Sequence, residues 1–198
     1  MPATPPADLS DRRLTDPGAM RALAHPLRLA MLRRLRTGGP ATATILAAEL
    51  DASVPSASYH LRQLERFGFI EDEDRPGGAR ERWWRAVSVG ETVESDELTT
   101  PEQVLASSEL GAAQVRHAAG VVLRHLDRSG RGEVGPEVMR ASWLSSSGLH
   151  LTLEEATALH GDFRGLIERY RARIDEANRP EGTRLFQMNI QLVPWDGR

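Results

Sequence analysis

Three short helices followed by a glycine-rich hairpin are the feature that most constrains how this chain folds. Capping residues and apolar residues at helical spacing predict helices over residues 16–38, 44–50 and about 55–67. Two segments of strand character, 69–73 and 80–89, flank the turn sequence Asp-Arg-Pro-Gly-Gly-Ala. A tight turn before the third helix and a hairpin after it predict a winged helix-turn-helix.

The ends of these helices are set by residues with particular backbone preferences. Asp16 is expected to cap the first helix, with Pro17 at its first position. Thr44 is expected to cap the second helix, and Gly68 can take the left-handed conformation that ends the third. His25 precedes a proline, so we expect it to organise that turn rather than to bind a ligand.

The third helix has one apolar side and one polar side. Ala57, Leu61 and Leu64 fall on the apolar side, where they can pack against the first two helices. Hydroxyl, amide and guanidinium groups reach base edges and phosphates, and a helix fits the major groove. For His60, a DNA contact and a half-buried position are equally open. The residues expected to read DNA are Ser56, Ser58, Tyr59, His60, Arg62 and Gln63, with Arg66 on the same polar side.

The hairpin and the second helix add candidate phosphate contacts. Arg75, Arg80 and Arg82 lie at or beside the hairpin tip, where they can approach the DNA backbone or a narrow minor groove. An ordinary solvated loop is the alternative. Acids at residues 71–74 precede the tip, so some must point away from DNA or limit the approach. Thr44 is expected to hold a phosphate through its hydroxyl and the free amides of its helix.

Three segments of the chain resemble the ArsR family of winged-helix repressors. They read ALAHPLRLAMLRRL, ILAAELDASVPSASYHLRQLERFGFI and ERWWRA, within residues 20–87, and their most specific parts are residues 24–28 and 56–64. The resemblance implies a homodimer that places its third helices in successive major grooves of a roughly palindromic operator. Half-sites would then lie about one helical turn apart, with the wing along the backbone.

Composition and charge limit the function classes further. The 198 residues contain no cysteine, which excludes disulfides and thiolate metal sites. No apolar run is long enough to cross a bilayer and no secretory signal is visible, so we expect a soluble, cytoplasmic protein without membrane association. Residues 1–90 carry a net charge of +2 and residues 91–198 a net charge of −5, which indicates two different roles.

The expected fold class is mainly α (α+β), with a few strands in the C-terminal region. We expect a disordered leader at residues 1–15, the DNA-binding domain at 16–90, a linker at 91–100, and a dimerisation and ligand-binding region at 101–198. Capping boxes at 100–103 and at 152–155 predict two long helices, the second reaching about Ala177 and burying its apolar residues. Residues 138–151 look extended, and 183–193 are expected to form a final strand.

Two sets of C-terminal residues carry functional hypotheses. A stripe at helical spacing is expected to form the dimer interface, with core packing within one subunit as the alternative. Five aromatic residues are expected to form the core of the C-terminal region or, as the less favoured hypothesis, to line a cavity for a small organic effector. The stripe consists of Val115, Ala119, Val122 and Leu126, and the aromatic residues are Trp143, Phe163, Tyr170, Phe186 and Trp195.

Other function classes find less support in the sequence. No phosphate-binding glycine loop, nucleophile elbow or His-Glu-x-x-His pair is present, so an enzyme is not expected. His117 and His125 are eight residues apart and lack a ligand four residues away, so no metal or other cofactor is expected. The remaining rival is a winged helix used to bind proteins, which would require an apolar third helix.

Overall fold

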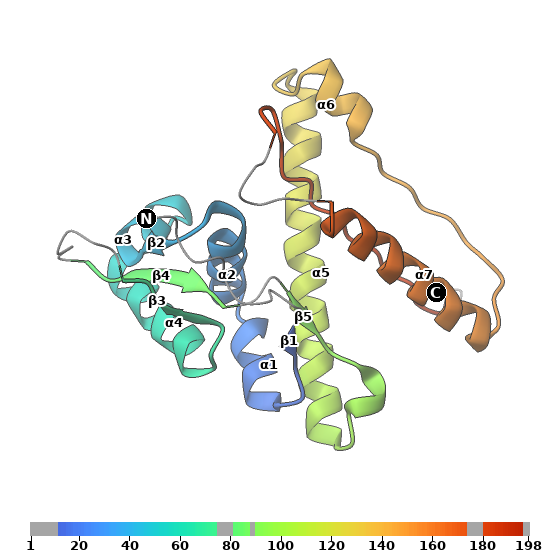
Figure 1. Ribbon diagram of the computed structural model, residues 1–198, viewed down its shortest axis with the longest axis horizontal. Helices are drawn as coiled ribbons and strands as arrows, with labels where there is room; N and C mark the ends of the chain where they lie inside the picture. Colours follow the sequence, from blue (N-terminus) through green and yellow to red (C-terminus); the bar gives the residue numbers. More distant parts are fainter. Residues whose placement is uncertain (1–11, 75–80, 88–89, 174–179, 196–198) are drawn as a thin grey trace. The chain divides into compact units, whose positions relative to one another are not determined.

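The computed structural model describes residues 12–74, 81–87, 90–173 and 180–195, and the chain divides into two compact units after Leu123 (Figure 1). Its secondary structure is mainly helical, as expected. In the first unit the elements are β1 (Arg12–Arg13), α1 (Pro17–Ala24), α2 (Pro26–Gly38), β2 (Ala41–Thr42), α3 (Ala43–Glu49), α4 (Val54–Arg66), β3 (Ile70–Asp72), β4 (Trp83–Ala86), β5 (Glu91–Thr92), a 3-10 turn (Ser95–Glu97) and the start of α5 (Pro101–Gly130).

The first predicted helix is two helices, and His25 separates them. Asp16 caps α1 by accepting hydrogen bonds from the amides of Gly18 and Ala19, at 3.0 and 3.1 Å. His25 has a ψ of 125°, the extended conformation that a following proline imposes. Its Nδ1 accepts a hydrogen bond from the Leu27 amide at 3.2 Å and so caps α2. The expected role of His25 in organising this turn is confirmed, and a single helix over 16–38 is wrong.

The helix-turn-helix itself consists of α3 and α4. Thr42, not Thr44, caps α3, because its Oγ1 accepts a hydrogen bond from the Ile45 amide at 3.3 Å. Ser53 caps α4 in the same way through the amide of Ser56, at 3.3 Å. The α4 helix ends before Gly68, which has a φ of 69°. This confirms the expected left-handed stop.

A three-stranded antiparallel sheet of order β2-β4-β3 joins the strand before α3 to the two strands after α4. Ala41 pairs with Trp84, and Ile70 pairs with Ala86. Neighbouring side chains on a strand face opposite sides, and accordingly Trp84 is buried while Trp83 is only half-buried. The predicted hairpin is therefore present, although its tip at 75–80 lies outside the described residues.

Residues of the expected leader form a strand pair with residues of the expected linker. Arg12–Arg13 and Glu91–Thr92 form the parallel pair β1–β5, and Leu14 is only 2% exposed. Arg36 and Glu91 form a bidentate ion pair with side chains 7% and 1% exposed. The prediction of a disordered leader is therefore wrong for residues 12–15, and the expected linker is part of the folded unit. Residues 1–11 lie outside the described range.

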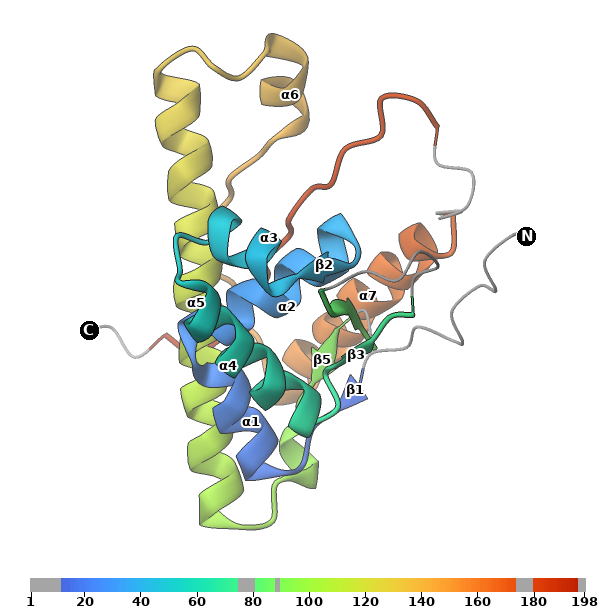
Figure 2. The same cartoon turned by 90° about the vertical axis from the view of Figure 1, so that its left-hand side faces the viewer.

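The core of the first unit is continuous from α1 to α5. Figure 2 shows α1 to α4 packed together, and the start of α5 joins the same core through Ala106 and Leu110. The expected capping box of α5 is confirmed. The backbone N–H of Gln103 donates to the Thr100 hydroxyl at 3.2 Å, and the backbone N–H of Thr100 donates to Gln103 Oε1 at 3.0 Å. Fully buried side chains include Met20, Leu23, Leu32, Leu46, Leu61, Leu64 and Phe69.

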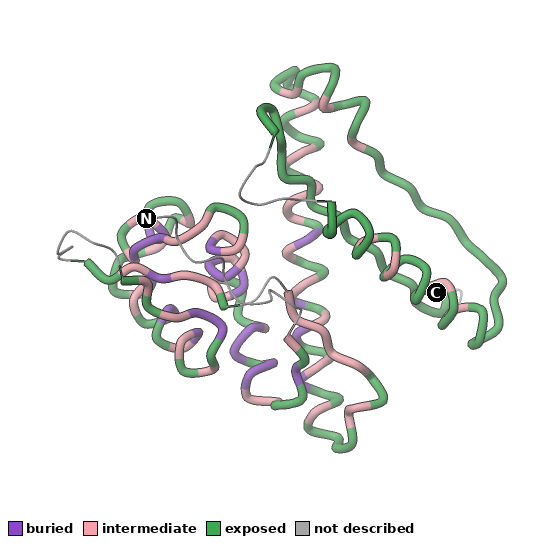
Figure 3. The backbone as a smooth tube through the Cα atoms, viewed as in Figure 1, coloured by how far each residue is buried: buried purple, intermediate pink, exposed green. Residues whose placement is uncertain are grey.

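The second unit has helices but no buried residue among those described (Figure 3). It contains α6 (Pro136–Ala141), where an extended segment was expected, and α7 (Leu153–Arg171), whose capping box at Thr152 is confirmed. No strand occurs in its described residues, so the strands expected at 138–151 and 183–193 are wrong for this chain by itself. No described helix has the length and apolar composition that crossing a membrane would need.

Candidate nucleic-acid interface

The two faces predicted for the third helix are present on α4. Ala57, Leu61 and Leu64 are completely buried, and α4 packs against α2 and α3. On the other side Tyr59 is 56% exposed. Arg62 and Arg66 are exposed, while Ser56, Ser58 and Gln63 are half-buried. An apolar side held by the core therefore orients a polar, basic side toward solvent.

This exposed side offers donors suited to DNA. Within the described part of the chain, no ion pair engages Arg62, and Arg66 lies over the ring of Phe67 with its guanidinium carbon 5.6 Å from the ring centre. A guanidinium group can donate two parallel hydrogen bonds to guanine or to phosphate. Tyr59 adds a ring and a hydroxyl between these arginines and the start of the helix. The α4 surface can thus contact both base edges and backbone.

His60 does not belong to this surface, because the structure buries it. It is 8% exposed, and its ring lies against the ring of His25 with centroids 4.4 Å apart and a tilt of 35°, while the Tyr59 ring meets it edge-on at 5.1 Å. Burial lowers the pKa of His60, and the nearby His25 and Arg28 lower it further. Of the two interpretations left open by the sequence, the structure supports the packing role, and the predicted DNA contact at His60 is not supported.

Of the three wing arginines predicted to approach DNA, Arg82 is the one that lies among the described residues. Its Nε donates to Asp72 Oδ2 and its Nη2 to Glu65 Oε1, both at 2.6 Å, and its guanidinium lies 4.0 Å from the centre of the Trp84 ring. Two carboxylates thus neutralise Arg82 and draw it toward α4. The acids around the wing limit its approach to DNA at this residue. Arg75 and Arg80 lie outside the described residues.

Thr44 is exposed near the start of α3, but its surroundings do not suit a phosphate. Its hydroxyl donates a hydrogen bond to Glu81 Oε1 at 2.8 Å. The Ile45 amide, one of the donors expected to hold a phosphate, is already bonded to Thr42. A neighbouring carboxylate repels a phosphate, so the anion contact predicted for Thr44 is not supported.

The stripe predicted for dimerisation remains accessible along α5. Val115 is 50% exposed and Leu126 is 45% exposed, Ala119 is exposed and Val122 is half-buried. The other side of the helix carries residues that pack inward, including Ala106, Leu110 and Ala113. The core of the first unit therefore does not cover this stripe.

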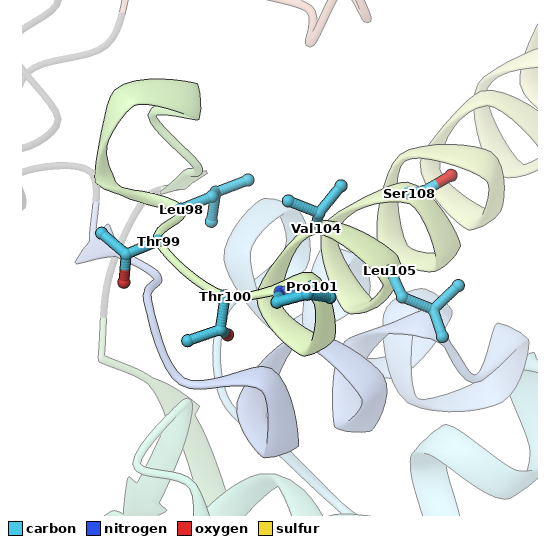
Figure 4. Close-up of a pocket in the computed structure, with 7 residues that line it drawn as sticks. All are labelled: Leu98, Thr99, Thr100, Pro101, Val104, Leu105 and Ser108. Carbon is cyan, nitrogen blue, oxygen red and sulfur yellow. The ribbon is translucent and has the colours of Figure 1, made fainter.

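An open depression at the start of α5 was not anticipated from the sequence (Figure 4). Val104 and Leu105 contribute to it with exposures of 54% and 55%. Its lining contains no charged side chain, and no group of three metal-ligating side chains occurs among the described residues. The lining residues are Leu98, Thr99, Thr100, Pro101, Val104, Leu105 and Ser108.

Sequence reasoning also missed the partners of the charged residues. Glu65 holds Arg82, and Glu91 holds Arg36 from 55 residues away. Nothing in the local sequence around these acids indicates their partners. The His25–His60 contact likewise joins the residue between α1 and α2 to a residue of α4, and only the proline after His25 pointed to a special role there.

Comparison with known proteins agrees with this geometry. A family model described as a helix-turn-helix domain matches residues 23–73, which include both segments that most specifically resemble the ArsR family, 24–28 and 56–64. This match confirms the predicted helix-turn-helix. The chain carries a helix-turn-helix domain. A comparison with curated proteins finds no match.

Several solved structures are similar to this helix-turn-helix domain. A crystal structure of an ArsR family transcriptional regulator is 34% identical, covers 46% of this chain and 89% of its own, and has a TM-score of 0.31. The homodimeric winged helix-turn-helix DNA-binding domain Mb0332 from Mycobacterium bovis is 17% identical, with 51% and 76% covered and a TM-score of 0.33. Reduced HlyU from Vibrio cholerae is 19% identical, with 45% and 78% covered and a TM-score of 0.31.

Proposed function

We propose that this chain, a DNA-binding transcription regulator, acts as an ArsR-type homodimeric repressor that reads a palindromic operator with α4. The observation that carries the proposal is the two-sided character of α4. Three completely buried side chains fix its orientation, and Tyr59, Arg62 and Arg66 are exposed on the other side. Exposed arginines on a helix of a size that fits the major groove are the groups that contact base edges and phosphates, which favours DNA as the partner of this face.

The reading residues are those of α4 that solvent reaches. Arg62 and Tyr59 are the main candidates, with Ser56, Ser58 and Gln63 at the edges of the same face. Arg66, toward the end of the helix, suits a phosphate contact. Arg82 contributes less than a free arginine would, because Glu65 and Asp72 already neutralise its charge.

A dimer is proposed because two copies of α4 are needed to read two half-sites. The exposed stripe on α5 supplies an apolar face for this contact, with Val115 and Leu126 about half exposed. Replacing Leu126 by Asp should weaken operator binding at low protein concentration, since a charge would enter the interface. The exposed Arg124, two residues away on the same helix, provides the matched control Arg124→Asp.

An effector is not part of the proposed function. The five aromatic side chains that the sequence suggested for a core or a cavity are 37–86% exposed, so in this chain by itself they form neither. Repression is proposed through occupation of the promoter. Transcription in vitro from the DNA upstream of the chain's own gene should fall as purified protein is added, and an increase would show an activator.

The direct test is binding to that upstream DNA at several salt concentrations, with unrelated DNA as competitor. Arg62→Ala and Tyr59→Ala should each weaken specific binding by about 1–3 kcal/mol without changing the helical circular dichroism signal. Arg116→Ala, at an exposed arginine of α5, is the matched control and should bind as the unaltered protein does. Equal affinity in all four proteins would contradict the assignment of α4 and favour a protein-binding winged helix.

A further inference from the structure

The C-terminal segment 185–192 has the pattern of a half-buried strand but no partner in its own chain. Apolar residues alternate strictly with amides from Phe186 to Leu192, which is the period of a strand with one apolar face. The Gln187 side chain donates to Asn189 Oδ1 at 3.2 Å, so the amides already share one side of an extended backbone. Within the described part of the chain, no backbone hydrogen bond joins 184–195 to another segment.

The apolar side of this segment is exposed along its whole length. Phe186, Met188, Ile190 and Leu192 are each 45–54% exposed. The described part of the second unit contains no buried residue, so its own chain offers no core onto which the strand could fold. An unpaired strand with an apolar face is not stable in water, and even a pair of strands needs further strands or a packed helix.

We propose that residues 186–192 pair antiparallel with the same residues of a second copy of the chain, centred on Asn189. The inference deepens the proposed homodimer and rests on it. With this centre Phe186 lies opposite Leu192, and Met188 lies opposite Ile190. All four apolar side chains then share one face of the two-stranded ribbon, and Gln187 faces Gln191 across the other.

Charge and area both favour a second copy as the partner. Residues 185–195 contain no charged side chain, so two identical strands meet without the like-charge repulsion that prevents self-pairing. An interface of standard size buries about 800 Å² on each partner. Aromatic side chains carry roughly 150–250 Å² each, and the second unit leaves five of them 37–86% exposed in addition to the strand and the apolar residues of α7.

The pairing would give the second unit the core that it lacks within one chain. Along α7, Phe163, Leu166 and Tyr170 are 37%, 40% and 59% exposed and recur at helical spacing. An apolar stripe of this kind and an apolar ribbon face are the two surfaces that an α+β layer packs together. The C-terminal unit is therefore a co-folded part of the dimer rather than a domain of each protomer.

The absence of cysteine allows a cross-linking test without background. Single cysteines are placed in turn at positions 186–192 of the full chain, and disulfide-linked dimers are measured under mild oxidation without DNA. Across a two-fold axis, equivalent residues face each other only at the centre, and their separation grows by about 7 Å for each residue away from it. Asn189→Cys should therefore cross-link at least tenfold faster than Phe186→Cys or Leu192→Cys. Ser146→Cys, at an exposed residue outside any helix, sets the background rate.

A second experiment tests the pairing of non-identical positions. A mixture of Gln187→Cys and Gln191→Cys chains should form the mixed dimer faster than either chain forms its own. Ile190→Asp in an Asn189→Cys chain should abolish cross-linking, whereas Gln191→Asp, on the amide side, should leave most of it. Rates equal to that of Ser146→Cys throughout, or equal rates at 187, 189 and 191, would overturn the antiparallel pairing. Cross-linking without DNA binding would instead leave this inference standing and refute the proposed function.

Discussion

The buried ion pair between Arg36 and Glu91 should control the stability of the DNA-binding unit. Replacing Glu91 by Gln keeps the shape of the side chain but leaves the guanidinium of Arg36 without a counter-charge, with that side chain 7% exposed. Removal of one partner from a buried pair costs about 3–5 kcal/mol, because the remaining charge cannot be solvated. Glu91→Gln should therefore lower the free energy of unfolding by about 3 kcal/mol or more.

Urea denaturation followed by circular dichroism measures this loss. With a slope of about 1–3 kcal/mol per molar urea, the midpoint should fall by at least about 1 M. Protomer concentration must be kept equal, since the proposed dimer would gain stability with concentration. Glu97→Gln is the matched control, because Glu97 pairs with Arg13 at side-chain exposures of 29% and 68%. An exposed pair of this kind contributes about 0–1 kcal/mol.

A double variant separates the charge from the packing. Arg36→Met with Glu91→Met removes both charges, and such replacements of buried pairs are often neutral or stabilising. We expect it to recover most of the stability that Glu91→Gln loses. If Glu91→Gln and Glu97→Gln lose the same amount, the pair is not buried in solution and the docking of residues 90–98 is refuted.

Three further predictions concern α3, α4 and the histidine contact. Thr42→Ala should cost about 1 kcal/mol of stability because it removes the cap of α3, whereas Thr44→Ala should stay within about 0.5 kcal/mol; equal losses in urea titrations would contradict the cap assignment. Glu65→Gln should strengthen DNA binding and steepen its salt dependence, since Arg82 loses one of its two carboxylates, and an unchanged slope would mean that Arg82 stays away from DNA. Burial lowers the pKa of both His25 and His60. The unfolded chain therefore binds more protons below its histidine pKa of about 6.5, and stability is lost as pH falls below that value. Between pH 7.5 and 5.5 the melting temperature should drop less in His60→Leu than in the unaltered protein, and an equal drop would exclude the histidine pair as the cause.

The parts of the fold that local chemistry determines could be predicted from the sequence. The buried face of α4, the cap at Asp16 and the stop at Gly68 follow from residue preferences within a few positions. The cap of α3 was misplaced by two residues because Thr42 and Thr44 have equal preferences, and only the core contacts of the 2% exposed Thr42 decide between them.

The parts that depend on distant residues could not be predicted. The local sequence around Arg82, an arginine beside a glycine-rich turn, predicts a DNA contact. Only the folded chain brings Asp72 and Glu65 within hydrogen-bond distance of it. For His60 the sequence could not decide between a DNA contact and a half-buried position, because the decision depends on His25, whose ring lies against that of His60 in the folded chain. A final strand was expected at 183–193, but a strand needs a neighbour, and the described chain contains none for it.

The pairing of β1 with β5 changes where the DNA-binding part of this chain ends. A fragment cut at residue 90 would keep every helix of the helix-turn-helix but would lose Glu91 and leave Arg36 buried with no counter-charge. It would also lose Ala106 and Leu110, which complete the core from the first turns of α5. The smallest piece that can be transplanted to another protein therefore extends from Arg12 into α5, and a fusion partner should be joined beyond Leu110 rather than at the end of the wing.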